Sequence, residues 1–426
     1  MASGPGRTMS EPFPPEGLPL EAARRRVLAA VQPLAESEPV SLAAALGRVS
    51  AAAVHATTAV PGFRASVMDG YAVVEGDPPP VGSRWVLVGR SAAGTPFPGR
   101  VGPGQAVRIL TGAALPEGAH RVLPQELLAC TDAADGTPPT LELTSAAGAN
   151  RWIRAADEEA AAGAELLPAG VRLGPADLAR LAGCGVDALQ VRRRPRLGLL
   201  VSGDELVPPG TARAAGQIWE SNGLLLSSLL RRLGQEVADL RVVRDDPDVL
   251  RPALAALARD CDVVVSTGGV SVGDGDWIRP LLAELGRVEF WKLFLRPGRP
   301  FAFGAIAGRP FFGLPGNPVS AAITALQLLW PALEHLEGVV EPPGLPRLRV
   351  RLATGVERRP GRPELARARL ESTPEGLPLA RLEGSQASSR IGSLQGADLL
   401  VEIPAEAERL EAGCELWAQL LRVPLF

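Results

Sequence analysis

Two spacings of apolar residues alternate along the chain and divide it into segments. Residues 18–54 and 163–191 have apolar positions spaced close to the helical period, and this spacing predicts helices. Ser41 is placed to cap a second helix that continues to Leu46. Residues 59–149 hold short Val and Leu runs divided by Gly and Pro, which predicts a small β-rich domain. The pattern therefore indicates a β-rich insertion within a helical domain.

Three short apolar runs mark the strands of a central domain that spans residues 196–337. The runs at 197–201, 263–265 and 311–314 are separated by helical segments, and each stops at a cluster of Gly with Ser, Asp, Glu or Asn. Runs of this kind are typical of buried parallel strands. Ligands of open α/β sheets bind at the carboxyl ends of the strands, so we expect the functional site where these clusters meet.

The spacing of apolar residues changes again after Pro342-Pro343. Apolar residues alternate with Arg at 347–352 and at 365–370, which predicts strands with one face in water. We therefore expect a multidomain protein of α/β and β domains, with a mostly parallel central sheet. The expected boundaries are 14–58 with 150–191 for the helical linking domain, 59–149 for the inserted β-rich domain, 192–340 for the α/β active-site domain and 341–426 for the C-terminal β domain.

Composition excludes several classes of function. A length of 426 residues, at about 150 residues per domain, agrees with several domains. The net charge of −3 gives no bulk attraction to nucleic acid or to an anionic membrane. Cys130, Cys184, Cys261 and Cys414 are scattered, so we expect buried free thiols instead of a zinc site or a disulfide framework. No long apolar span and no secretory segment is found, so we expect a cytoplasmic protein.

Two polar clusters follow the first two predicted strands. Ser202-Gly203-Asp204-Glu205 places two carboxylates directly after a strand, although a turn in which Asp204 caps its own backbone would explain the same residues. Residues 267–276 are rich in glycine, which lets a phosphate approach backbone N–H groups closely. Asp274 and Asp276 in this second cluster could instead cap the helix that follows.

Further charged groups are expected at the same edge of the sheet. Asn317-Pro318 provides an N-cap and a Pro at the first helical position, and a helix N-terminus carries partial positive charge. Arg296 and Arg299 add guanidinium groups, and Asp245-Asp246 adds carboxylates, of which Asp246 is placed to cap a helix. Carboxylates repel a phosphate unless a hard cation bridges them. The residues therefore predict Mg²⁺-assisted chemistry at a phosphate or pyrophosphate.

Several longer motifs carry a resemblance to a known family. They are SVMDGYA at 66–72, VRILTGA at 107–113, SGDEL at 202–206, TGGVSVG at 267–273, PGRPFAFG at 297–304 and LPGNPVS at 314–320. With these motifs in this order, nearly the whole chain resembles the molybdopterin molybdenumtransferase family, the MoeA-type proteins and the E domain of gephyrin.

The resemblance implies a fold, an activity and an assembly. The fold has four domains, with a central domain similar to MogA and a C-terminal domain similar to a β-barrel. The implied enzyme takes adenylylated molybdopterin and molybdate, inserts molybdenum at the dithiolene and releases AMP with Mg²⁺ present. The implied assembly is a homodimer whose active site lies between the central domain of one subunit and the β-rich domain of the other. An adenylyltransferase partner could hand over the substrate.

The predicted site combines the polar clusters with the positions that match the family motifs. The expected catalytic residues are Asp69, Thr111, Glu205 and Asp276, and the expected metal ligands are Glu205, Asp245, Asp246 and Asp276. The residues expected to bind substrate or phosphate are Ser202, Gly203, Asp204, Gly268, Gly269, Ser271, Gly273, Asp274, Arg296, Gly298, Arg299, Pro315, Gly316, Asn317, Pro318 and Ser320. Asp69 and Thr111 come from the resemblance alone.

Two positions depart from the family pattern. Residues 152–159 stand where the family often has Asn-x-Arg-x-x-Gly-Glu-Asp, and they keep Arg154 but lose the Asn and the Gly. The loop can then lie differently, so the place of Glu159 in the site stays open. Arg299 stands where the family has Lys, and it keeps the charge with a different hydrogen-bonding geometry.

Two other functions explain part of the chain. An adenylyltransferase of the MogA type would explain the central domain and its glycine cluster, but not Asp69, Thr111 or the C-terminal domain. A non-enzymatic scaffold, like the E domain of gephyrin, would leave the carboxylates without a role. The residues do not distinguish molybdate from tungstate as the preferred anion.

Overall fold

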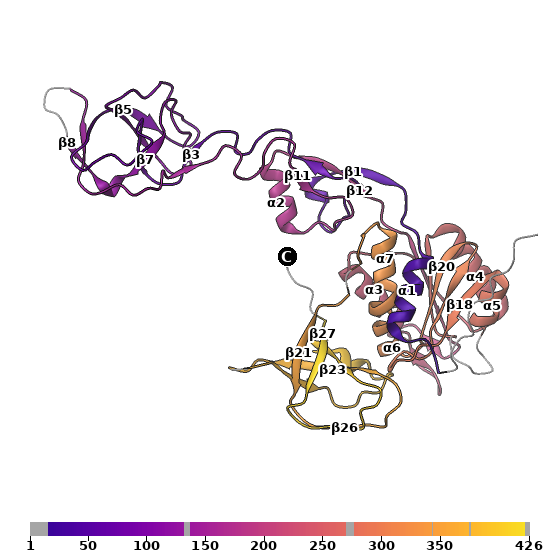
Figure 1. The fold of residues 1–426 in the computed structure, drawn as a ribbon. Coiled ribbons are helices and arrows are strands. Elements are labelled where there is room, and N and C mark those ends of the chain that lie inside the picture. Colours follow the sequence, from indigo (N-terminus) through magenta and orange to yellow (C-terminus); the bar gives the residue numbers. More distant parts are fainter. Residues whose placement is uncertain (1–15, 132–136, 270–276, 343, 375, 422–426) are drawn as a thin grey trace, which may run out of the picture.

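The structure is a computed structural model that describes residues 16–131, 137–269, 277–342, 344–374 and 376–421. The molecule is elongated (Figure 1): the β-rich domain lies at one end, a slender linking domain follows, and the central and C-terminal domains lie next to each other at the other end. No helix within these ranges is long and apolar enough to cross a membrane.

The central domain is built on a six-stranded, mostly parallel sheet. Its strand order is β16-β13-β17-β20-β19-β18, in which the first four strands are parallel and the last two pair antiparallel. The prediction of buried parallel strands is confirmed, because the three apolar runs of the sequence form β13, β17 and β20. The bounds are β13 Leu197–Ser202, β16 Val237–Val243, β17 Val263–Thr267, β18 Gly286–Trp291, β19 Ala302–Ile306 and β20 Arg309–Leu314.

Helices cover both faces of this sheet (Figure 1). Their bounds are α1 Leu20–Ala30, α3 Asn222–Arg232, α4 Pro247–Asp260, α5 Ile278–Leu285, α6 Pro318–Thr324, a π-helical turn Ala325–Leu329 and α7 Trp330–Leu336. Leu199 and Val201 of β13 pack in the core with α1, α3 and α6, whereas Leu200 packs with α4 and α5. The predicted cap of α4 is confirmed, since the Asp246 carboxylate accepts a hydrogen bond from the Asp248 backbone N at 2.8 Å.

Helix α1 packs on the central domain, although its sequence position had suggested the linking domain. Its Val27 is buried in the core of the central sheet. Arg24 donates hydrogen bonds to the backbone O of Gln327 at 3.2 Å and to Gln327 Oε1 at 3.3 Å. Gln327 Nε2 in turn donates to Gln419 Oε1 of the C-terminal domain at 2.7 Å. This chain of contacts holds the C-terminal domain against the central one.

The linking domain contains less helix than the sequence predicted. The expected helix from Ser41 to Leu46 is wrong, because residues Leu42–Ala44 form a single 3₁₀ turn. The 163–191 segment holds one helix between strands. The pairs are β1 Ser37–Ser41 with β12 Ala188–Arg192, and β2 Val54–His55 with β11 Glu165–Leu167, around α2 Pro175–Gly183. These strands are short and their partners are distant in sequence, so tertiary pairing overrides the local spacing.

Arg172 ties the linking domain to the central domain. Its Nε donates to Glu334 Oε2 at 2.7 Å and its Nη2 donates to Glu337 Oε2 at 2.8 Å. The two glutamate side chains are 2% and 0% exposed. Burial raises the pKa of Glu334, and the positive charge of Arg172 offsets only part of that effect. The two carboxylates therefore depend on Arg172 for their charge balance.

Replacing Arg172 by Ala is expected to lower the free energy of unfolding by about 3 kcal/mol, because two buried carboxylates lose their partner. The loss should shrink as the pH falls through the raised pKa of Glu334, since protonation removes a buried charge. Thermal unfolding over a pH series measures both effects. Arg100→Ala, which breaks an exposed pair with Glu117, is the control and should change stability by about 1 kcal/mol at most. Equal losses in the two variants would contradict this account.

The β-rich domain confirms the predicted change from helix to strand. It is a six-stranded sheet of order β7-β4-β6-β5-β9-β8. Where the chain enters and leaves the domain, β3 Ala65–Ser66 pairs with β10 Ile153–Arg154. The bounds of the sheet are β4 Gly70–Val73, β5 Arg84–Ser91, β6 Gln105–Ile109, β7 Arg121–Pro124, β8 Leu128–Thr131 and β9 Thr140–Leu143.

The C-terminal domain is a closed five-stranded barrel, as the resemblance implied, in the order β21-β24-β23-β25-β27. The bounds are β21 Arg347–Leu352, β23 Glu364–Glu371, β24 Leu379–Leu382, β25 Leu399–Ile403 and β27 Glu415–Leu420, with a small outer pair of β22 Val356–Glu357 and β26 Arg409–Leu410. The exposure of β21 alternates as predicted. The same prediction is wrong for β23, because Arg367 is 0% exposed and donates to Ser393 Oγ at 3.1 Å. The segment between β24 and β25 covers this side of the strand.

The four cysteines are free, as predicted, but only two of them are buried. Cys184 and Cys261 lie in hydrophobic cores, whereas Cys130 is exposed and Cys414 is half-buried. Burial is the largest cause that raises the pKa of the Cys261 thiol. A raised pKa keeps this thiol neutral, so it behaves as a small apolar side chain.

Candidate functional site

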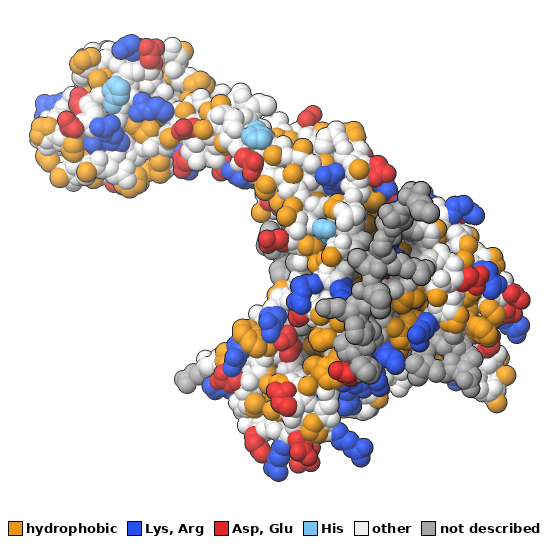
Figure 2. Space-filling model, turned by 45° about the vertical axis from the view of Figure 1, so that its right-hand side comes forward, with side chains coloured by type: hydrophobic (Ala, Val, Ile, Leu, Met, Phe, Trp, Pro, Cys, Tyr) orange, Lys and Arg blue, Asp and Glu red, His pale blue; other side chains and the backbone are white. Residues whose placement is uncertain are grey.

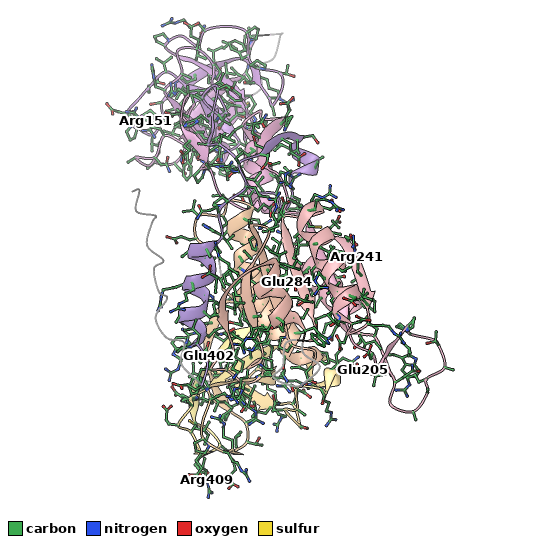
Figure 3. All side chains as sticks on the ribbon, turned by 90° about the vertical axis from the view of Figure 1, so that its right-hand side faces the viewer. Arg151, Glu205, Arg241, Glu284, Glu402 and Arg409 are labelled. Atoms are coloured by element: carbon green, nitrogen blue, oxygen red, sulfur yellow. The ribbon has the colours of Figure 1, made fainter. Side chains whose placement is uncertain are left out.

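A cavity of about 1030 Å³ lies at the carboxyl ends of the central strands, between the central and C-terminal domains. Figure 3 shows Glu205 at the end of the central domain that faces the C-terminal barrel. The structure brings many of the predicted residues together here. Those that line the cavity are Ser202, Glu205, Asp245, Gly268, Gly269, Arg296, Gly298, Arg299, Pro315, Gly316, Asn317, Pro318 and Ser320.

Two of the predicted carboxylates, Glu205 and Asp245, line this cavity. Asp245 Oδ1 and the hydroxyl oxygen of the neighbouring Ser202 are buried, and apart from the contact between these two groups neither has a hydrogen-bond partner in the described part of the chain. Burial is the largest cause that raises the pKa of Asp245; the Ser202 hydroxyl lowers it in part, and the charges of Asp204 and Glu205 raise it further. A half-buried carboxylate with no positively charged partner is unfavourable, so a cation bound here would be stabilised.

The loop after β17 passes very close to the end of β13. Gly268 has a φ of 95°, and a Cβ at this position would lie 2.3 Å from the backbone O of Ser202. Only glycine fits such a contact and such a backbone conformation. The predicted contact of this loop with a phosphate stays a prediction, but the close packing already explains why Gly268 is glycine.

Asn222, the first residue of α3, holds three loops of the cavity together. Its Nδ2 donates to Thr267 Oγ1 at 3.0 Å and to the backbone O of Gly316 at 2.7 Å. Thr267 Oγ1 donates in turn to the backbone O of Pro315 at 2.9 Å. The ends of β17 and β20 are thereby fixed to the start of α3. The sequence analysis missed Asn222, although an amide residue directly after the cap position Ser221 was the available signal.

Three arginines, Arg296, Arg299 and Arg362, line the same cavity. Burial is the largest cause that lowers the pKa of Arg362, and the positive charges of Arg299 and Arg296 lower it further. Arg296 is paired, since its Nε lies 3.5 Å from Glu364 Oε1. Arg299 has no ion pair among the described residues. Three carboxylates, Glu205, Glu220 and Asp245, also line the cavity, so positive and negative groups are balanced there. Guanidinium groups suit tetrahedral oxyanions in particular, so the arginines can bind such an anion.

The C-terminal domain completes the cavity, which the sequence analysis missed. Besides Arg362, it contributes Gln386, Ala387, Ser388, Ser389 and Ile391 to the lining. The backbone O of Ser388 accepts a hydrogen bond from the backbone N of Val319 at 3.1 Å, which joins this segment to the start of α6. Asn317 occupies the predicted N-cap of α6, but its side chain makes no capping hydrogen bond. One N–H group of the predicted anion site is therefore already bonded within the protein.

Asp69 and Thr111 form a pair of their own in the β-rich domain. Asp69 Oδ1 accepts hydrogen bonds from Thr111 N and Thr111 Oγ1, both at 2.8 Å. The antiparallel pairing of β4 with β6 places Gly70 opposite Ile109 and so brings the two residues together. The Thr111 backbone N–H is the main cause that lowers the pKa of Asp69, which keeps the carboxylate ionised. In one chain the domain that carries this pair lies far from the cavity (Figure 1).

The remaining predicted residues lie elsewhere. Gly203 and Asp204 stand beside the cavity without lining it, and Asp246 is occupied as the cap of α4. Glu159 pairs with Arg180 in the linking domain at 3.0 Å. Ser271, Gly273, Asp274 and Asp276 lie outside the described residues, and α5 begins beyond them, with Trp277 at its N-cap. No group of three or more His, Cys, Asp or Glu residues is arranged to hold a metal within the described ranges.

Family models match most of the chain. They are the MoeA N-terminal region (domain I and II) at 18–185, a probable molybdopterin binding domain at 198–335 and the MoeA C-terminal region (domain IV) at 349–421. The molybdopterin molybdenumtransferase of Haemophilus influenzae is 37% identical over 321 residues, which cover 75% of this chain and 78% of that protein. Molybdopterin molybdenumtransferase 2 of Mycobacterium tuberculosis is 31% identical over 402 residues, which cover 92% of this chain and 97% of that protein. The chain belongs to the molybdopterin molybdenumtransferase family.

Family membership confirms the resemblance that the motifs carried. The crystal structure of a molybdopterin biosynthesis MoeA protein from Pyrococcus horikosii has a TM-score of 0.74 at 29% identity, and the match covers 96% of this chain and 100% of that one. A molybdopterin molybdenumtransferase fold of linking, β-rich, central and barrel domains therefore describes the whole molecule.

Proposed function

We propose that the cavity is the active site of a molybdenum insertase, where molybdenum enters adenylylated molybdopterin and AMP is released with Mg²⁺ present. The family places the chain among the transferases of molybdenum cofactor synthesis. One observation carries the proposal to this cavity: guanidinium groups and an unpartnered carboxylate oxygen share a single space of about 1030 Å³. The guanidinium groups suit molybdate and phosphate, and the carboxylate suits a divalent cation.

The anions are assigned to the arginine-lined part of the cavity. Molybdate is a tetrahedral dianion like phosphate, so it needs N–H and O–H donors together with a positive charge. Arg299 and Arg362 provide the charge, and Ser320, Ser388 and Ser389 add hydroxyl groups to the same lining. Arg299 also offers two parallel N–H groups where the family has Lys, which changes the geometry and preserves the charge.

The carboxylates Asp245 and Glu205 fit Mg²⁺, which prefers oxygen ligands. Asp245 Oδ1 is buried without a positively charged partner, as a ligand oxygen would be before its cation binds. When bound, Mg²⁺ would neutralise charge on the pyrophosphate and on the departing AMP. Asp246 is better explained as the cap of α4 than as a metal ligand. Asp276 stays a predicted ligand outside the described residues.

A second copy of the chain is proposed to supply Asp69 and Thr111. The pair is exposed and lies far from the cavity of its own chain, so it contributes only if another subunit docks (Figure 1). Figure 2 shows a broad open space between the β-rich domain and the C-terminal domain. Exposed apolar side chains occur on both domains that would share the site, and they are Phe63 and Val67 beside Asp69 in the β-rich domain, and Leu224, Leu240 and Val242 on α3 and β16 of the central domain.

The two alternative functions account for less of the molecule. A MogA-type adenylyltransferase corresponds to the central domain alone and leaves the N-terminal and C-terminal family regions unexplained. A pure scaffold leaves the arginine cluster and the buried oxygen of Asp245 without a ligand. A nucleotide assay separates these functions, because the adenylyltransferase consumes ATP, the scaffold consumes nothing and the insertase releases AMP from adenylylated molybdopterin. We also propose that a separate adenylyltransferase hands the adenylylated molybdopterin over to this enzyme.

Replacing Arg299 by Ala is expected to weaken the apparent affinity for molybdate by about tenfold or more, because a charge-assisted contact is lost. Nucleotide binding should change much less, since Arg296 and Arg362 remain in the cavity. Titrations of the variant with molybdate and with AMP give the two values. Arg259→Ala, on the exposed surface of α4, is the control and should change neither. Equal losses for the two ligands would mean that Arg299 holds the pyrophosphate instead of molybdate.

A further inference from the structure

The cavity contains a flat apolar surface that the arginines and carboxylates do not explain. Two short parallel strands after the Ser202–Glu205 cluster, β14 Leu206–Val207 and β15 Ile218–Trp219, form a projecting arm. Ile218 and Trp219 both line the cavity, and they are 49% and 47% exposed. Exposure of two large apolar side chains inside a charged cavity is unfavourable unless a ligand covers them.

The Trp219 ring is held in a fixed position. Its Nε1 donates a hydrogen bond to the backbone O of Thr211 at 2.9 Å. The guanidinium carbon of Arg213 lies 3.9 Å from the ring centroid, so Arg213 covers one face of the indole. Trp219 lines the cavity and Arg213 does not, so part of the Trp219 side chain is open to the cavity while Arg213 covers one face of the ring. The ring is therefore supported from behind and open toward the cavity.

We propose that Trp219 is a stacking surface for a planar heteroaromatic ring of the substrate, while the arginines of the same cavity hold its phosphate. This inference rests on the proposed function, because it concerns the ligand of that site. An aromatic ring in the same cavity as Arg296 and Arg362 matches a molecule that joins a flat ring to a phosphate. Adenylylated molybdopterin carries two such rings, adenine and pterin, and either has a π-face that can stack.

The alternative to a stacking role is that Trp219 is simply a solvent-exposed tryptophan that binds no ligand. Trp417 shows that an exposed tryptophan of this chain can pack against arginines. Trp417 is 42% exposed on the C-terminal barrel, with Arg347 and Arg349 at 4.8 and 5.4 Å from its ring centroid. It does not line the cavity. Trp417 lines a separate cavity of about 950 Å³ that also contains Arg347 and Arg349. Trp219 differs from it in lining the cavity that holds Arg296, Arg299 and Arg362. Trp417 therefore serves as a matched control for the loss of an exposed, arginine-stacked tryptophan.

The test is calorimetric titration of the full-length protein with AMP and with ribose 5-phosphate, which lacks the ring. Trp219→Ala is expected to weaken AMP binding by about fivefold to a hundredfold and to leave ribose 5-phosphate binding unchanged. Trp219→Phe should restore most of the AMP affinity, whereas Trp219→Leu, which is apolar but not aromatic, should not. Trp417→Ala should bind both ligands like the wild type.

A second arm with 6-hydroxymethylpterin distinguishes the two rings. Selective loss of AMP binding in Trp219→Ala assigns adenine to Trp219, and selective loss of the pterin assigns the pterin. Unchanged binding of both ligands overturns the stacking role, as does equal loss of ribose 5-phosphate, which would indicate general disruption of the cavity. If ribose 5-phosphate fails to bind the wild type while AMP binds, the arginine site of the proposed function is wrong and the stacking role survives.

Discussion

Replacing Asp245 by Asn is expected to raise the melting temperature in a chelating buffer and to reduce AMP release by about 10²-fold or more. Asp245 Oδ1 is buried without a positively charged partner, and burial raises the pKa of the carboxyl more than the Ser202 hydroxyl lowers it, so the ionised group destabilises the cation-free protein. This destabilisation is present at neutral pH and disappears as the pH falls through the raised pKa. The amide removes the charge at every pH, and it also removes the proposed ligand of Mg²⁺.

Thermal unfolding with chelator and with Mg²⁺ measures this prediction. Mg²⁺ should raise the melting temperature of the wild type and should have little effect on Asp245→Asn. Asp246→Ala is the neighbouring control, because Asp246 caps α4 through the Asp248 backbone N. That control should lose about 1 kcal/mol of stability while AMP release stays near the wild-type rate. If Mg²⁺ raised the melting temperature of Asp245→Asn as much as that of the wild type, Asp245 would not be a ligand of the metal.

A heterodimer of an Asp69→Asn chain with a Glu205→Gln chain is expected to recover about half of the wild-type AMP release. Each substitution alone should reduce the rate by about 10²-fold, because each removes a charged group of the proposed site. In the heterodimer, the site that joins the central domain of the first chain to the β-rich domain of the second has both wild-type residues. The position of the Asp69–Thr111 pair, far from the cavity of its own chain, is the physical reason for this expectation (Figure 1).

Two affinity tags, one on each chain, isolate the heterodimer for the assay. Light scattering of the wild type should give about twice the chain mass of 44.5 kDa. An inactive heterodimer would place all catalytic residues of a site within one chain. A chain that stays monomeric at full activity would exclude the shared site altogether.

The central domain was predictable because its signals are local. Apolar runs such as 263–265 and 311–314 end at Gly or Pro, and in a parallel sheet those ends must meet at one edge. The same rule located Ser202, Glu205 and Arg299 in one cavity. Strong periodicity and turn residues next to each other in the sequence thus determine this part of the site.

The contribution of the C-terminal domain was not predictable in this way. Arg362, Ser388 and Ser389 reach the cavity only because the barrel packs on the central domain through contacts such as Gln327 with Gln419. Arg367 shows the same limit within a strand: its alternating neighbours predicted an exposed side chain, and a distant segment buries it. Packing between segments far apart in the sequence leaves no periodic signal in either of them.

The linking domain shows why local helical spacing is insufficient. Strand β1 pairs with β12, and β2 pairs with β11, across the whole inserted domain. The pairing selects an extended backbone for residues whose spacing alone favours a helix. Asp69 and Thr111 are brought together by the pairing of nearby strands β4 and β6. Their proposed role could not be inferred from that pairing, because it depends on a second chain.

The initial rate of AMP release from adenylylated molybdopterin, measured with and without molybdate at saturating Mg²⁺, tests the central claim most directly. The account predicts that wild-type release requires molybdate, that the released AMP is matched by molybdenum bound at the dithiolene, and that Asp245→Asn reduces both by about 10²-fold or more. Release at the same rate without molybdate, or release near the wild-type rate in Asp245→Asn, would contradict the assignment of this cavity as the site of molybdenum insertion.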